Sequence, residues 1–404
     1  MTARRERLLG LALIILVAVN LRPAITSVGP VLTEIRHDFG LSGTAAGALT
    51  TLPLVFFGVY GLAAVFLRRH PRGETLLVSS MALLVVALGL RLLDAPVALF
   101  TGSLVAGIAI SVGNVAMPAI IKRDFPGSIT TVTALYTVAV TIGAAVSSGI
   151  AVPVQDLFDS GWRLPLALWT IPAALAAVAW LPRAWRAAGG PAPAAPPTRA
   201  MTARVWRSRL AWHVTVFMGV QSLLAYVVIG WLPTICQDRG LGETPAGYVL
   251  ALSALSQAVG NLAMPLLARR IGDQRPLVIT VVALSLIGFA GIGWAPIGSV
   301  WLWAFVLGLG QGIGFGTALA FLGLRAHDAG VAAQLSGMAQ GTGYVIAALG
   351  PLAIGALHDA THGWTVPILV SMAIAAGLAF PGLAAGRNRT VGAPEPVPVS
   401  PALG

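Results

Sequence analysis

Arg22 stands alone among apolar residues, near the middle of a hydrophobic segment that covers residues 8–32. An ionisable side chain at the centre of a bilayer costs about 2.5 to 3.5 kcal/mol even on the lenient insertion scale, so a compensating interaction is expected. A guanidinium stays protonated at physiological pH and presents a planar fork of donors that fits small oxyanions and carboxylates. The sequence therefore predicts that Arg22 binds an anion inside the membrane.

No acidic side chain is placed to neutralise this arginine. The chain has 14 Asp and Glu residues, and all of them fall in loops, tails or the ends of apolar segments. The alternative role for Arg22, a bond to backbone carbonyls of a neighbouring helix or a reach toward an interface, is therefore less favoured. A membrane-embedded carboxylate that loads and releases protons is not expected either. If transport is coupled to an energy source, the coupling would depend on substrate exchange, on an acid or His in a loop, or on a proton carried with the substrate.

The sequence contains no residue pattern that is typical of a catalytic or metal-binding site. The single Cys cannot form an intramolecular disulfide, and the six His show no zinc-site spacing. No nucleophile, metal cluster or carboxylate pair stands near a segment end. We therefore expect no cofactor, no metal site and no enzymatic activity.

Neutral polar side chains recur near the middle of other apolar segments, where they are candidates for substrate binding. The alternative is that each makes an interhelical hydrogen bond of about 0.6 kcal/mol. Two pairs match at an offset of 201 residues, Asn20 with Gln221 and Tyr60 with Asn261, and four-residue spacing puts Gln257 and Asn261 on one helix face. The full set of candidates beside Arg22 is Asn20, Tyr60, Asn114, Tyr136, Gln221, Gln257, Asn261, Gln311 and Tyr344.

Five alternating glycines at 308–316 superficially resemble a phosphate-binding loop. They lie inside an apolar segment, with no preceding strand and no following Lys-Ser or Lys-Thr, so nucleotide binding is rejected. Small residues at this density predict close approach of neighbouring helices instead.

The composition explains where all these side chains must sit. Hydrophobic residues make up 57% of the chain and charged residues 10%, with a mean hydropathy of +0.85, so a soluble fold is excluded. Apolar segments of about 20 residues can each cross a bilayer as a helix. They are expected near residues 8–32, 44–67, 75–93, 97–121, 129–155, 163–182, 209–235, 244–268, 276–294, 299–323, 330–356 and 364–385.

These segments divide the chain into two groups of six. Residues 1–182 and 209–386 form the predicted helical bundles, residues 183–208 a Pro-rich and Arg-rich linker, and residues 387–404 a disordered tail. Most cations fall in the N-terminus, the linker, the tail and the loops on the same side, and eight acids fall on the other side. The net charge of +11 is thus a topology signal that places both termini in the cytoplasm of an inner-membrane protein, and not a nucleic-acid-binding patch. Tryptophans near segment ends predict an interfacial belt that includes Trp162, Trp180, Trp231 and Trp364.

The two groups of segments are related by an internal duplication. Gly-Leu-Ser-Gly-Thr-Ala-Ala-Gly at 40–47 recurs as Gly-Leu-Gly-Glu-Thr-Pro-Ala-Gly at 240–247, and the Gly-Trp-x-x-Pro at 161–165 recurs at 363–367. Both copies occupy the same place in their half. A parallel duplication of this kind predicts two six-helix bundles with a pathway along the pseudo-two-fold axis between them.

This layout resembles the major facilitator superfamily over essentially the whole chain. The loop signature of that superfamily, Gly-x-Leu-Ala-Asp-Arg-x-Gly-Arg, is only partly matched in each half. Arg68 and Arg269 replace its Asp, so the gating role of that Asp is not expected here. The first segment is more specific and is similar to the cyanate and nitroimidazole transporter branch, often called CynX/NimT. The similarity rests on Asn20-Leu-Arg22-Pro23 and on Gly29-Pro30-Val-Leu-Thr-Glu34-Ile-Arg36-His-Asp38-Phe-Gly40.

The resemblance implies an all-α membrane protein of twelve transmembrane helices in two pseudo-symmetric bundles, a monomer in the lipid bilayer. Spans one, four, seven and ten line the cavity of that fold, which would place Asn20, Arg22, Gln221 and Gln311 in one layer around the ligand. The expected function is secondary active transport of a small anion or small polar organic molecule, cyanate-like or nitroaromatic, by alternating access. An uncoupled anion facilitator, a drug or metabolite exporter of the same fold and an integral-membrane enzyme are the rival interpretations. Cationic dyes that compete for transport would favour the exporter.

Overall fold

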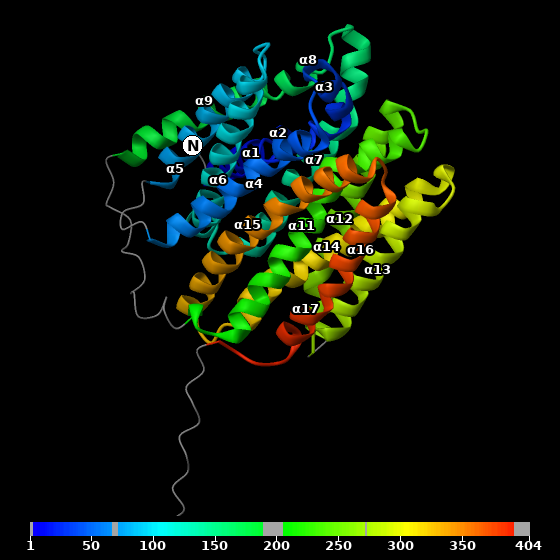
Figure 1. Ribbon diagram of the computed structural model, residues 1–404. Helices are drawn as coiled ribbons and strands as arrows, with labels where there is room; N and C mark the ends of the chain where they lie inside the picture. The colour runs from blue at the N-terminus through cyan, green and yellow to red at the C-terminus, as the bar shows by residue number, and fades with distance from the viewer. Residues whose placement is uncertain (1–2, 67–71, 189–204, 271–272, 392–404) are drawn as a thin grey trace, which may run out of the picture.

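The computed structural model describes residues 3–66, 72–188, 205–270 and 273–391. Within these ranges the regular structure is helical apart from one isolated bridge between Ala326 and Val391. Twelve helical segments are long and apolar enough to cross a membrane. The predicted all-α fold with twelve transmembrane helices is therefore confirmed (Figure 1).

Six of these segments precede residues 189–204 and six follow them. The helices of the first half are α1 (Ala3–Ala18), α2 (Pro23–Thr26), η1 (Gly29–Val31), α3 (Leu32–Phe39), α4 (Gly43–Phe66), α5 (Gly73–Leu90), α6 (Pro96–Asp124), α7 (Ile129–Phe158), α8 (Arg163–Ala167) and α9 (Thr170–Ala188). Those of the second half are α11 (Arg209–Asp238), α12 (Glu243–Arg270), α13 (Arg275–Trp294), η2 (Ile297–Ser299), α14 (Val300–Leu324), α15 (Ala329–Thr361), α16 (Thr365–Gly377) and α17 (Ala379–Gly386).

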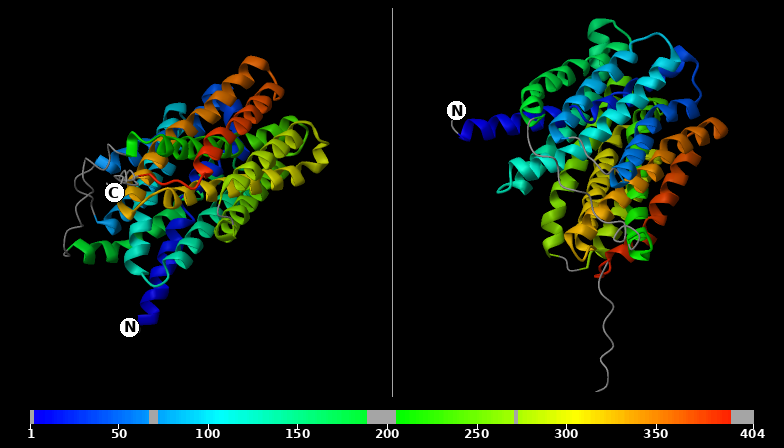
Figure 2. Two further views of the ribbon diagram at one scale, coloured as in Figure 1. Left: turned by 90° about the horizontal axis from the view of Figure 1, so that it is seen from below. Right: turned by 90° about the vertical axis from the view of Figure 1, so that its left-hand side faces the viewer.

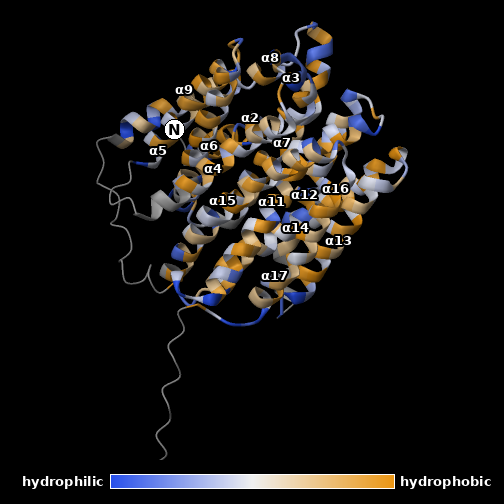
Figure 3. Ribbon diagram, viewed as in Figure 1, coloured by the Kyte–Doolittle hydropathy of each residue, from blue (hydrophilic) through white to orange (hydrophobic). Residues whose placement is uncertain are grey.

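The predicted linker at 183–208 and tail at 387–404 lie largely outside the described residues. Helix α9 continues to Ala188, past the expected end of the sixth span at residue 182. The N-terminal end of α1 projects from the bundle, and Arg5 and Arg7 on it are exposed (Figure 2). Hydrophobic residues predominate along the long helices, while hydrophilic residues gather toward the loops (Figure 3).

The first transmembrane segment is broken rather than continuous. Helix α1 ends at Ala18, the chain turns through residues 19–22, and α2 begins at Pro23 with Arg22 as its N-cap. Proline at the first helical position is favourable, because its missing N–H would have no partner there. The break lies in the middle of the predicted span, so Arg22 sits at the junction of two helices.

The duplicated Gly-Trp-x-x-Pro segment forms the same contact in each half. The indole of Trp162 donates to Asp38 at 2.7 Å, and that of Trp364 donates to Asp238 at 2.7 Å. Each acceptor precedes a glycine in the left-handed region, Gly40 (φ 60°) and Gly240 (φ 92°). A left-handed glycine is a common way to end a helix, so both copies stop the first span of their half in the same way.

Three of the four tryptophans expected in an interfacial belt are buried instead. Trp162, Trp180 and Trp231 each have 0% of their surface exposed. Their indoles donate to Asp38, to the Leu13 carbonyl and to the Pro351 carbonyl, respectively. The belt interpretation is wrong for these residues, because an indole near a span end can also turn inward when an acceptor within the protein is available.

The glycine-rich segment of α14 packs closely against two neighbouring helices. A Cβ atom on Gly308, Gly312 or Gly316 would lie within 2.6 Å of atoms of α12. Gly310 and Gly314 face Leu284 and Val281 of α13 instead. Alternate glycines thus serve two helix contacts, which agrees with the prediction of close helix approach.

Candidate functional site

A cavity of about 830 Å³ lies between the two halves. Residues of α2, α4, α6 and α7 line it from the first half, and residues of α11, α12, α14 and α15 line it from the second. Among the described lining residues Arg22 is the only charged side chain; the others are apolar or carry hydroxyl and carboxamide groups. The cavity therefore has a single fixed positive charge.

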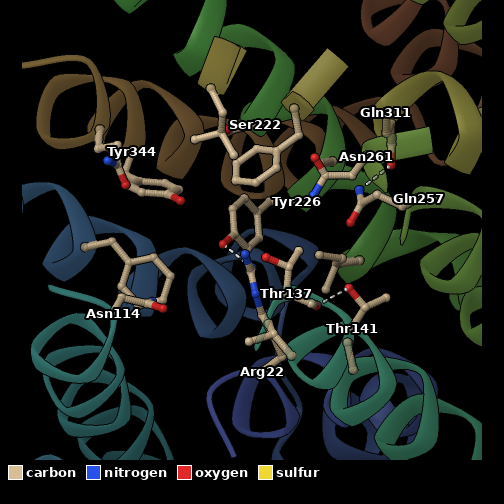
Figure 4. A pocket seen from close by; sticks show the side chains of 18 of the residues that line it. Arg22, Asn114, Thr137, Thr141, Ser222, Tyr226, Gln257, Asn261, Gln311 and Tyr344 are labelled. Carbon is tan, nitrogen blue, oxygen red and sulfur yellow. Dashed lines mark hydrogen bonds between the residues drawn. The ribbon is translucent and has the colours of Figure 1, made fainter. Parts of the chain in front are cut away.

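Arg22 reaches across the cavity to the opposite half. Its Nη1 donates to the hydroxyl of Tyr226 on α11 at 2.5 Å, and its guanidinium carbon lies 5.5 Å from the Tyr226 ring centroid (Figure 4). The broken first span aims the side chain this way, because Arg22 lies at the turn where α2 begins. The side chain thus points into the cavity, where its partner is a neutral phenol.

A second polar pair lies on the first-half wall. The hydroxyl of Tyr136 on α7 donates to the Asn114 side chain on α6 at 3.1 Å. Tyr344 of α15 also lines the cavity and lies beside Tyr226 (Figure 4). Aromatic rings with polar tips therefore surround the guanidinium on several sides.

Carboxamides form a separate group on the second-half wall. Gln257 of α12 donates to Gln311 of α14 at 3.4 Å, and Gln311 donates to the Leu224 carbonyl of α11 at 3.3 Å. Asn261, four residues after Gln257, also lines the cavity, as the predicted helix face requires (Figure 4). This group offers donors and acceptors to an uncharged part of a ligand.

Eight of the ten predicted site residues line the cavity, and Asn20 and Tyr60 do not. The Asn20 side chain is 1% exposed and donates back to the Leu16 carbonyl at 2.7 Å. Its expected partner Gln221 does line the cavity, with its amide on Ser222 at 2.7 Å. The structure thus does not bring Asn20 and Gln221 together in one ligand layer.

Tyr60 of α4 does not line the cavity, whereas Phe57 of the same helix does. Successive side chains are turned by about 100° around a helix, so Phe57 and Tyr60 point in different directions. Asn261, which matches Tyr60 at an offset of 201 residues, lines the cavity from α12. The two matched positions therefore do not both face the cavity.

Tyr226 is a cavity-lining partner of Arg22 that the sequence-based selection missed. It lies near the middle of the seventh span, five residues after Gln221, so the criterion that selected the carboxamides applied to it as well. Hydroxyls on α7, including Thr137, Thr141 and Ser148, were also missed. Ser and Thr are common in transmembrane helices, where they bond their own backbone, as Thr141 does to the Thr137 carbonyl at 3.0 Å. Sequence alone gives no signal that separates the hydroxyl residues that line the cavity from those that do not.

The cavity extends toward one end of the bundle and is closed at the other. The end at which α9 finishes and α11 begins is called the linker end. Lining residues Pro118, Thr133 and Ala333 lie near that end and are exposed. At the opposite end, called the sealed end, α3 and α8 lie together (Figure 1) and hydrogen bonds join the two halves, such as Thr33 to Gln237 at 2.6 Å. The structure is therefore open toward the linker end.

Comparison with known proteins agrees with this architecture. The Major Facilitator Superfamily profile matches residues 14–348. The chain is 36% identical to the 2-nitroimidazole transporter of Escherichia coli (strain K12), over 96% of this chain and 98% of the relative. It is 32% identical to the cyanate transport protein CynX of the same organism, over 86% and 90% of the two chains. The nucleoside transporter NupG shares the fold, with a TM-score of 0.72 at 13% identity over 94% of this chain and 98% of that one.

The match to the superfamily profile and the identities to these two relatives cover most of the chain. Together with the twelve helical spans they leave no ambiguity about its class. The chain belongs to the Major Facilitator Superfamily, in its CynX/NimT branch, and is a multi-pass membrane transporter.

Proposed function

We propose that this protein is a secondary active transporter that moves a small organic or inorganic monoanion across the inner membrane by alternating access, with Arg22 as the substrate anchor. The observation that carries the proposal is the single positive charge of the described cavity wall. Relatives named for 2-nitroimidazole and cyanate support a small substrate that is nitroaromatic or cyanate-like. A small polar molecule without full charge would use the same hydroxyl and carboxamide groups.

The geometry of Arg22 fits this role. A guanidinium has five N–H donors, so the bond to Tyr226 leaves donors for an anion. Tyr226 lies on the other half of the protein, so an anion bound at this pair would contact both halves at once. Such a bridge is how a substrate can favour the closed intermediate that lies between the two open states.

Counterflow in proteoliposomes tests the proposal. Vesicles that hold a high concentration of unlabelled cyanate or 2-nitroimidazole are expected to accumulate the labelled compound transiently, and small monocarboxylates are the further members of the panel. Flux without this transient accumulation would favour a channel-like facilitator without coupling. Competition by cationic dyes would instead favour an exporter.

The Tyr226 hydroxyl is expected to strengthen substrate binding. Tyr226→Phe keeps the ring and removes one hydrogen bond to Arg22, so substrate affinity should fall by about fivefold, the equivalent of one net hydrogen bond. Binding to the purified protein measures this effect. Tyr248→Phe is the matched control, because Tyr248 is 45% exposed on α12 and does not line the cavity. Equal affinities for the two variants would exclude a role of the Tyr226 hydroxyl in binding.

Both termini and the linker are expected to face the cytoplasm. The positive charges of the N-terminus, linker and tail favour this orientation, which would make the linker end of the cavity cytoplasmic. A protease site placed between residues 189 and 204 and a tag after Gly404 should both be reached only in inside-out vesicles. Cleavage at the introduced site by protease added to intact spheroplasts would show the opposite orientation.

A further inference from the structure

The duplicated segments at 40–47 and 240–247 lie at the sealed end, away from the cavity. The first contains the start of α4 and the second the start of α12. Each helix start faces an aspartate of the opposite half, Asp359 near the end of α15 and Asp156 near the end of α7. Each of the two contacts thus joins a Thr of a duplicated segment to an Asp of the opposite half.

The contact of α4 with α15 is a complete helix cap supplied by the other half. The backbone N–H groups of Gly43 and Thr44 donate to the two carboxylate oxygens of Asp359, each at 2.7 Å, and the Thr44 hydroxyl donates to Oδ2 at 2.9 Å. Free N–H groups at a helix start favour negative charge. A Cβ on Gly43 would lie 2.5 Å from Asp359 Oδ1, so the carboxylate fits only because residue 43 is glycine.

The contact of α12 with α7 is weaker, and the sequence explains why. There the Thr244 hydroxyl alone donates to Asp156, at 3.3 Å. Glu243 occupies the place that Gly43 has in the first copy, so a side chain and a second negative charge stand where the carboxylate would approach. Asp156 therefore remains exposed and reaches only the hydroxyl.

Other hydrogen bonds between the halves at this end join neutral groups. Thr33 donates to the Gln237 side chain, Gln237 donates to the Pro30 carbonyl, and Thr51 donates to the Ala348 carbonyl. Charge-assisted bonds are roughly twice as strong as neutral ones. Asp359 is thus the strongest polar contact that the described residues place across the sealed end.

We propose that Asp359 is the principal gate residue of the sealed end, and that Asp156 forms a weaker contact of the same kind between the halves. The sealed end opens when the Asp359 carboxylate leaves the start of α4, which frees the halves to separate there. The proposal rests on the alternating access of the proposed function, and it makes no use of Arg22 or of any particular substrate.

Access of a thiol reagent to the cavity tests the gate without a substrate. The chain's single cysteine, Cys236, is buried and is replaced by serine; Ala254→Cys then places a reporter in the cavity wall. A membrane-impermeant maleimide is added to intact vesicles in which the sealed end of the protein faces the outside solution. Asp359→Asn should raise the labelling rate about tenfold, which corresponds to about 1.4 kcal/mol. Thr44→Val, which loses one of three bonds, should raise it about threefold, and Asp156→Asn less than twofold.

Asp94→Asn is the matched control. Asp94 pairs with Arg163 at 2.5 Å within the first half, so its loss removes a charged contact without freeing the halves, and labelling should stay at the reference rate. Gly43→Ala should act in the same direction as Asp359→Asn, because its Cβ takes the place of the carboxylate. The reference is the protein with only Cys236→Ser and Ala254→Cys. If folded Asp359→Asn and Thr44→Val proteins are labelled no faster than this reference, the proposal is overturned. If Asp359→Asn does not fold, Thr44→Val decides by the same criterion.

Discussion

Arg22→Ala is expected to weaken binding of the transported anion by at least a hundredfold. Two charge-assisted hydrogen bonds, at about 1.5 kcal/mol each, account for a loss of this size. Arg22→Lys keeps the charge and loses the planar fork, so its affinity should lie between those of the wild type and the alanine variant. Affinities for 2-nitroimidazole and for cyanate, measured on both variants in one detergent, give the comparison.

The melting temperature of ligand-free protein separates this role from a structural one. Arg22 has no acidic partner among the described residues, and Tyr226 faces the cavity, so removal of the guanidinium leaves no buried charge without a partner. The alanine variant should therefore melt at or above the wild-type temperature. An arginine that held two helices together would instead cost several kcal/mol on removal. A destabilised Arg22→Ala protein with near wild-type affinity would disprove the substrate anchor.

Among the substitutions proposed here, Gly312→Ala is expected to lower the free energy of unfolding most. A Cβ at this position would lie 2.0 Å from the backbone oxygen of Gln257. The new Cβ on α14 would meet backbone of α12, which cannot rotate away as a side chain can. The two helices must therefore separate, at a cost of about 3 kcal/mol. The same displacement moves Gln257 and Gln311, and so transport should fall together with the melting temperature.

Gly323→Ala in the same helix controls for the loss of glycine itself. No atom lies within 4 Å of a Cβ at Gly323, and alanine is the better helix former by up to about 1 kcal/mol. Its melting temperature should therefore be unchanged or slightly higher. Equal melting of the Gly312 and Gly323 variants would show that the close approach of α12 and α14 contributes nothing.

Most of the fold follows from the sequence because lipid allows few alternatives. A spanning segment in hydrocarbon must satisfy its own backbone, which leaves helices of predictable length. The break before Pro23 was harder to predict. Proline can begin a helix, kink one or end one, and neighbouring helices decide which occurs. Here Arg91, buried to 1% exposure, donates to the Ala24 carbonyl of α2 at 2.6 Å, a contact between α2 and the end of α5 that no local pattern shows.

The site was predictable in its chemistry and less so in its geometry. Arg22 and the carboxamides of α12 and α14 stand out because polar groups are costly in lipid. Asn20 meets the same criterion, yet the turn after α1 directs its amide back to Leu16. Tyr60 meets it as well, yet Phe57 of the same helix lines the described cavity and Tyr60 does not. Depth in the membrane can be read from sequence position, whereas orientation around a helix needs the packed neighbours.

The single positive charge of the cavity has an electrical consequence. With a monoanion on Arg22 the mobile charge is zero, so the loaded protein reorients without sensing the membrane voltage. The empty cavity keeps the one positive charge of Arg22, and moving one charge through the whole membrane field is worth about 2.3 kcal/mol per 100 mV. A potential that is negative on the linker side holds the empty protein open to that side. If Arg22 binds the anion as proposed, voltage thus acts on the return of the empty carrier and not on the step that carries the substrate.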